Sequence, residues 1–71
     1  MIVADRAVVE WMQQVRAEYL DMPGLTLTKE QMRRLWRLDR PLCDAVVDAL
    51  VASEFLERRP GDLYVRRSAH P

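Results

Sequence analysis

Turn residues and helix caps restrict the fold of this chain more than any other feature, because they divide it into short segments. Pro23-Gly24 ends an amphipathic helix that the apolar spacing predicts over residues 4–21. Thr28, with Gln31 three residues later, fits a capping box and therefore predicts the start of a second helix. That helix is expected to run to about Arg37.

A third helix is predicted to begin at Asp39 or Arg40. Asp39 is a good N-cap, and Pro41 is tolerated in a first helical turn, where the backbone N–H has no intrahelical partner. The helix is expected to end near residues 53–54. Pro60-Gly61-Asp62 then predicts a tight turn between two extended segments. The expected strands are 25–27, 55–59 and 63–67.

Each helix carries an apolar face that predicts one shared core. The first face contains Val8, Trp11, Met12, Val15 and Tyr19. The second contains Met32, Leu35 and Trp36, and the third contains Leu42, Cys43, Val46, Val47, Leu50 and Val51. Phe55, Tyr64 and Met22 are also expected to pack inside. The chain therefore reads as a single domain over 1–67 with a frayed tail at 68–71, mainly α with a small β-hairpin.

Composition limits where this domain works. No apolar run approaches the ~20 residues that span a bilayer, so we expect no membrane partner. The first residues lack the pattern of a secretory signal. A single cysteine, Cys43, allows no internal disulfide and is expected to be a buried hydrophobe. These observations favour a cytoplasmic location.

Residues 25–67, LTLTKEQMRRLWRLDRPLCDAVVDALVASEFLERRPGDLYVRR, resemble the winged helix-turn-helix domains of bacterial transcription regulators, the MarR-like ones among others. Thr28 matches the helix cap of those domains, and Leu38-Asp39-Arg40 matches the turn into the recognition helix. Leu50, Phe55 and Leu56 match the entry to the β-hairpin wing. The stretch from Glu18 to Leu25 also resembles short uncharacterised bacterial proteins that combine it with the same pattern. The resemblance implies three helices plus a wing.

Three positions depart from that pattern. Arg37 and Glu54 stand where the family often has glycine, and Arg33 stands where a small residue is usual. Glycine takes positive φ easily, whereas arginine and glutamate do not. We therefore expect turns that differ in detail from the common helix-turn-helix.

Charge is balanced overall, with eleven basic and eleven acidic residues, but it is unevenly placed. Residues 29–71 hold nine of the cations, and ten of the eleven cations are arginine, which suits bidentate phosphate contacts. Cations follow the second helix at Lys29, Arg33 and Arg37, and Arg40 opens the third helix. The hairpin adds Arg58, Arg59, Arg66 and Arg67, and Arg58 is expected near Arg67 across the two strands.

These cations, together with Thr28, predict a surface that grips the phosphates of double-stranded DNA through the second helix and the wing, with Arg40 probing base edges. Asp44 and Asp48 oppose this interpretation, because they lie one turn apart on the helix that would read bases. The alternative is a solvated surface with local ion pairs, such as Arg40 with Asp44 and Glu54 with Arg58.

Two functions remain open at the level of sequence. One is a DNA-binding transcription regulator that pairs as a homodimer through its first helix, using Ile2, Val3, Val9 and Trp11. The other is a winged-helix protein–protein interaction module without DNA binding. The sequence offers no nucleophile with a nearby base, no phosphate loop and no metal-ligand cluster, and its single histidine, His70, is in the tail. We therefore expect no enzyme activity, metal or cofactor.

Overall fold

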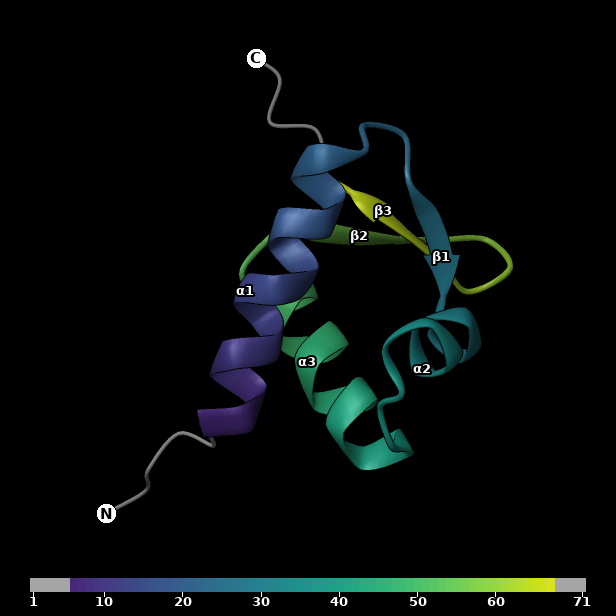
Figure 1. The fold of residues 1–71 in the computed structure, drawn as a ribbon. Coiled ribbons are helices and arrows are strands. Elements are labelled where there is room, and N and C mark those ends of the chain that lie inside the picture. The colour runs from purple at the N-terminus through teal and green to yellow at the C-terminus, as the bar shows by residue number, and fades with distance from the viewer. Residues whose placement is uncertain (1–5, 68–71) are drawn as a thin grey trace.

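The computed structural model describes residues 6–67. Its elements are α1 (Arg6–Asp21), β1 (Thr26–Thr28), α2 (Lys29–Trp36), α3 (Arg40–Ala52), β2 (Leu56–Arg59) and β3 (Leu63–Arg66) (Figure 1). This order confirms the predicted fold class, a mainly helical, winged-helix-like arrangement of three helices and a β-hairpin. The predictions for residues 4–5 and for the tail at 68–71 lie outside the described residues.

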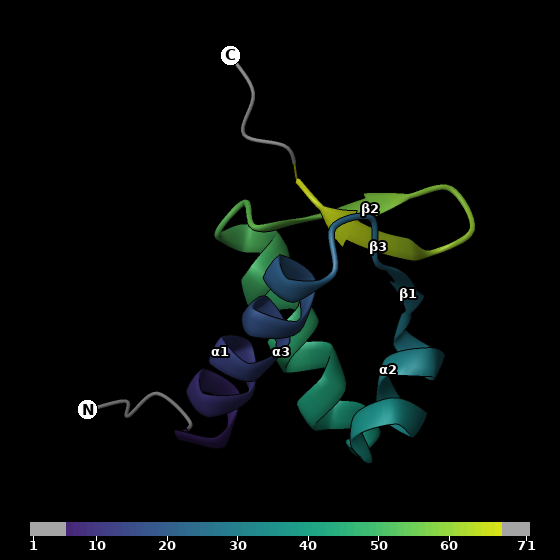
Figure 2. The same ribbon diagram turned by 45° about the horizontal axis from the view of Figure 1, so that its top comes forward.

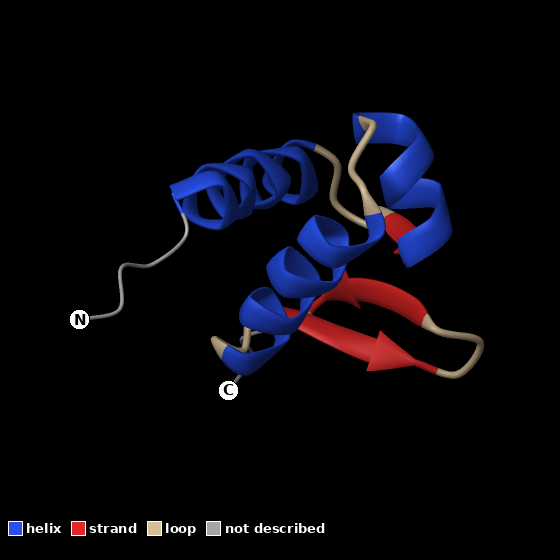
Figure 3. Cartoon of the chain, turned by 90° about the horizontal axis from the view of Figure 1, so that it is seen from below, coloured by secondary structure: helices blue, strands red, loops and turns tan. Residues whose placement is uncertain are grey.

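The three strands form one antiparallel sheet in the order β1-β3-β2. β1 begins one residue later than predicted, because its pairing with β3 runs from Thr26 opposite Val65 to Thr28 opposite Leu63. β2 and β3 form the hairpin, with Arg59 opposite Leu63 beside the turn. Figure 3 shows this hairpin extending away from the helices, in the position of a wing.

α3 lies between α1 and α2, with the sheet across one end of the helices (Figures 1 and 2). Its predicted face is confirmed, because Cys43, Val46, Val47 and Leu50 are buried. On α1, Val15 and Tyr19 are buried, and Val8, Trp11 and Met12 pack against them. Burying each such side chain stabilises the fold by about 1.5–3 kcal/mol before conformational entropy is counted.

Two of the predicted core residues are exposed instead. Leu35 is 57% exposed, and Met22 is 46% exposed. α2 contains only 8 residues and buries one of them, Met32, and no other element among residues 6–67 covers the face that carries Leu35. Met22 falls in the turn after α1, beyond the last helical residue that packs on the core.

The predicted helix starts are confirmed in detail. The Thr28 hydroxyl accepts from the backbone N–H of Gln31 at 3.1 Å, and the Gln31 side chain accepts from the Thr28 N–H at 2.8 Å. Asp39 caps α3 by accepting from the N–H of Leu42 at 2.9 Å. Each cap is worth about 1 kcal/mol and fixes where the following helix begins.

The helix ends correct one expectation, because Arg37 and Glu54 do adopt positive φ, at 54° and 65°. Beyond Arg37, the N–H of Leu38 donates to the carbonyl of Arg33 at 3.0 Å, and beyond Glu54, the N–H of Phe55 donates to Leu50 at 2.9 Å. These bonds close both helices in the manner of a Schellman motif. They also direct Leu38 and Phe55 inward, which offsets the strain of a non-glycine residue.

None of the helices within residues 6–67 is both long enough and apolar enough to span a membrane.

Candidate nucleic-acid interface

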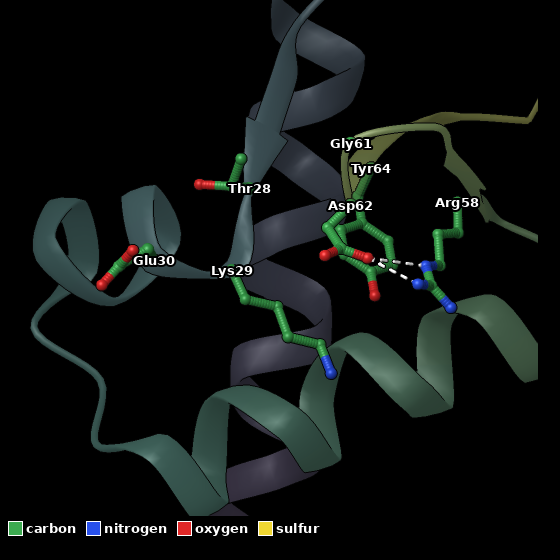
Figure 4. A pocket seen from close by; sticks show the side chains of 7 residues that line it. All are labelled: Thr28, Lys29, Glu30, Arg58, Gly61, Asp62 and Tyr64. Atoms are coloured by element: carbon green, nitrogen blue, oxygen red, sulfur yellow. Dashed lines mark hydrogen bonds and ion pairs between the residues drawn. The ribbon is translucent and has the colours of Figure 1, made fainter.

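Two adjacent hollows are lined by some of the cations of α2, α3 and the wing. The first, about 530 Å³, lies between the start of α2 and the hairpin turn and is lined by Thr28, Lys29, Glu30, Arg58, Gly61, Asp62 and Tyr64 (Figure 4). The second, about 280 Å³, lies between α2 and α3 and is lined by Lys29, Glu30, Arg33, Arg40 and Asp44. Both include Lys29 and Glu30. We refer to the two together as the cationic hollows.

Lys29 connects the two hollows. Its Nζ lies 3.1 Å from a carboxylate oxygen of Asp44 and 3.6 Å from one of Asp48. It also lies 5.8 Å from the centre of the Tyr64 ring. Burial lowers the pKa of Lys29, but the hydrogen bond to Asp44 and the surrounding negative charges outweigh burial and raise it above its ordinary value. The acidic pair on α3 is therefore partly neutralised within the protein.

Arg58 is held at the wing turn by Asp62. Its Nε and Nη2 donate to the same carboxylate oxygen at 3.0 Å and 2.6 Å, and this contact raises the pKa of Arg58 above its ordinary value. Both side chains are mostly exposed, so the pair contributes little to stability. Figure 4 shows it beside Tyr64 at the rim of the first hollow.

The predicted meeting of Arg58 with Arg67 is wrong. Arg58 stands opposite Tyr64. In an antiparallel hairpin, residues close to the turn on one strand pair with residues close to the turn on the other, so Arg58 cannot face Arg67 just beyond the far end of β3. The backbone N–H of Arg67 instead donates to the carbonyl of Phe55 at 2.8 Å, at the far end of the hairpin. The four wing arginines therefore fall into two groups, Arg58 and Arg59 near the turn and Arg66 and Arg67 at the far end of the hairpin.

The ion pairs expected within α3 and beyond it are replaced by others. Asp44 pairs with Lys29 rather than with Arg40. Glu54 faces Arg67 at 3.9 Å rather than Arg58, because α3 ends at Ala52 and no helical turn brings Arg58 back to it. On the wing, Arg59 lies 2.8 Å from Glu57.

Arg33 and Arg40 differ from these cations because, within residues 6–67, neither takes part in an ion pair. The Nε of Arg33 is buried and finds no hydrogen-bond acceptor among the described residues. An unsatisfied buried donor costs about 1–3 kcal/mol. Because this Nε is shielded from solvent, an external anion meets the guanidinium of Arg33 only through its other nitrogens.

The other predicted site residues lie outside the cationic hollows. Arg37 is exposed beyond the end of α2. The guanidinium of Arg66 stacks on the Phe55 ring, 6.0 Å from its centre. Sequence reasoning missed Asp62, Tyr64 and Glu30 as lining residues. Of these three residues, only Asp62 had a local signal in the sequence, because it follows Arg58 by four residues across the turn.

The predicted dimer surface on α1 is only partly described. Val9 is 41% exposed, and Trp11 is half-buried against the core. Ile2 and Val3 lie outside the described residues.

The described residues also contain no group of three or more histidine, cysteine, aspartate or glutamate side chains placed to hold a metal ion. Comparisons of the chain with protein families, with curated proteins and with solved structures found no match.

Proposed function

We propose that this protein binds double-stranded DNA through the cationic hollows, with Arg33 and Arg40 as the principal phosphate contacts. The observation that carries the proposal is that these two arginines line one hollow between α2 and α3 without a carboxylate partner among residues 6–67. Guanidinium groups bind phosphate oxygens bidentately, and a duplex presents phosphates at regular intervals along its backbone.

The wing and the start of α2 supply further contacts in this proposal. Arg58 lines the neighbouring hollow together with Lys29 and Thr28. The carboxylate partners of Lys29 and Arg58 are half-exposed and exposed, respectively, so a phosphate competes with these carboxylates for the same donors. The resemblance to bacterial transcription regulators supports a regulatory role, with two copies on a two-fold symmetric site.

Carboxylates also limit how tightly such a surface binds. Asp44, Asp62 and Glu30 line the hollows themselves, and Asp48 lies in the same region, 3.6 Å from the Nζ of Lys29. Each repels a phosphate backbone. The proposal is therefore a domain that holds the backbone with few contacts and reads base edges little.

The test is the affinity of single-charge variants for a mixed-sequence duplex carrying a fluorescent label. Arg33→Gln and Arg40→Gln should each weaken binding by roughly fivefold to tenfold, since each removes a charged hydrogen-bonding group. Arg16→Gln is the matched control, because Arg16 lies on α1 against the Phe55 ring. Equal affinities for all three variants, with circular dichroism showing intact folds, would contradict the proposal.

A further inference from the structure

The two tryptophans of the chain line a second kind of hollow. About 360 Å³ in volume, it is lined by Glu10, Trp11, Gln14, Glu18 and Trp36. α1 supplies Glu10, Trp11, Gln14 and Glu18, and the end of α2 supplies Trp36. These two helices flank α3 in Figure 2. We call it the tryptophan groove. It shares no lining residue with the cationic hollows, so both surfaces can be occupied together.

The charges of the tryptophan groove favour a cation. Glu10 and Glu18 lie two helical turns apart on α1, and neither forms an ion pair with another residue of 6–67. Trp11 and Trp36, which line the same groove, are half-buried against the core, and this packing holds their indole rings in place. Indole is the aromatic ring that binds cations best, and nearby carboxylates strengthen the attraction.

Among biological cations, the arginine guanidinium matches this groove. It is planar and weakly hydrated, so it can lie on an indole face while its edge donates to a carboxylate. Lysine offers the charge without the flat surface. A nucleic acid is disfavoured in the groove, because its two unpaired carboxylates repel phosphates and no cation lines it.

We propose that the tryptophan groove binds an arginine side chain from a basic segment of a partner protein, with the guanidinium between Trp11 and Trp36 and its edge on Glu18 or Glu10. This site is independent of the proposed DNA binding. It gives the domain a second surface of opposite charge preference, and only if the proposed DNA binding also holds does a partner bound there lie beside DNA.

The experiment uses intrinsic fluorescence, because both tryptophans of the chain line the groove and no other tryptophan contributes. The probe is a capped pentapeptide, Gly-Ser-Arg-Ser-Gly, and its control replaces the arginine with citrulline, which has nearly the same shape and no charge. The arginine peptide should change the emission saturably, and the citrulline peptide should bind about tenfold more weakly.

Two α1 variants locate the site. Glu18→Gln should weaken the arginine peptide by about threefold or more, whereas Asp21→Asn, an exposed carboxylate outside the groove, should leave its affinity unchanged. Equal binding of the two peptides, or equal behaviour of the two variants, overturns the proposal. Self-association in sedimentation experiments that Glu18→Gln abolishes also overturns it, because the occupant is then a second copy of this chain.

Discussion

At the scale of single residues, Tyr19 links the helices to the sheet. It is 1% exposed, and its hydroxyl donates to the carbonyl of Tyr64 at 2.7 Å. Its ring also meets Phe55 edge-on, with 6.4 Å between ring centres. Burial disfavours the charged phenolate and raises the pKa of Tyr19 to about 12. One side chain therefore joins α1 to β3 and makes the fold sensitive to alkaline pH.

The stability of the domain should fall between pH 10.0 and about 12, the ordinary and the raised pKa of Tyr19. In this window the unfolded chain has released the phenolic proton and the folded chain has not, so rising pH favours unfolding. Below the window both states keep the proton, and Tyr19 adds no pH dependence. Urea unfolding at a series of alkaline pH values measures the effect. Tyr19→Phe should remove this part of the fall, and an unchanged slope in that variant would show that Tyr19 does not cause it.

Arg37 and Glu54, two of the three non-glycine residues with positive φ among residues 6–67, give a second prediction at this scale. Arg37→Gly and Glu54→Gly should each raise the free energy of unfolding by about 1 kcal/mol, because glycine adopts positive φ without strain. The contact of Glu54 with Arg67 is long and exposed, so its loss subtracts little. Arg34→Gly, inside α2, is the control and should destabilise by about 1 kcal/mol. Destabilisation by Arg37→Gly would mean that the strain is already relieved elsewhere.

At the scale of elements, contacts between residues close in the sequence could be predicted, and contacts between residues far apart in the sequence could not. Caps depend on neighbours three residues apart, as in Thr28 with Gln31 and Asp39 with Leu42, so the helix starts could be predicted from the sequence. The contact of Lys29 with Asp44 joins residues on two helices and depends on how α2 packs on α3. No local pattern contains that packing, and the same is true of the exposure of Leu35 on the short helix α2.

The candidate site follows the same division. The sequence placed the cations on the correct elements, but it did not tell which of them already have carboxylate partners. Arg40 was expected to pair with Asp44, and the structure instead leaves Arg40 without an ion pair among residues 6–67 while Asp44 holds Lys29. The acidic face of α3 thus pairs with α2 through Lys29.

The acidic face of α3 should weaken DNA binding. Asp48→Asn should tighten binding to a mixed-sequence duplex by about threefold, because it removes a mostly exposed carboxylate and leaves Lys29 held only by Asp44. Asp21→Asn removes the same charge from α1, away from the cationic hollows, and should leave the affinity unchanged. Equal tightening by both variants would point to net charge alone rather than to α3.

At the scale of the whole molecule, zero net charge hides two surfaces of opposite character. The cationic hollows join α2, α3 and the wing turn, and the tryptophan groove joins α1 to the end of α2. Under the two proposals, one small winged-helix-like domain presents an anion-binding surface and a cation-binding surface from a single core. The proposed DNA binding depends on the anion-binding surface.

The salt dependence of duplex binding tests that surface most directly. Each phosphate contact releases condensed counterions, so the logarithm of the binding constant should fall linearly with the logarithm of salt concentration, with a slope of about −2 to −4. The shallow end corresponds to Arg33 and Arg40 alone, and the steep end adds Lys29 and Arg58. Absence of binding even at low ionic strength, or binding with a slope near zero, would contradict a phosphate-gripping domain.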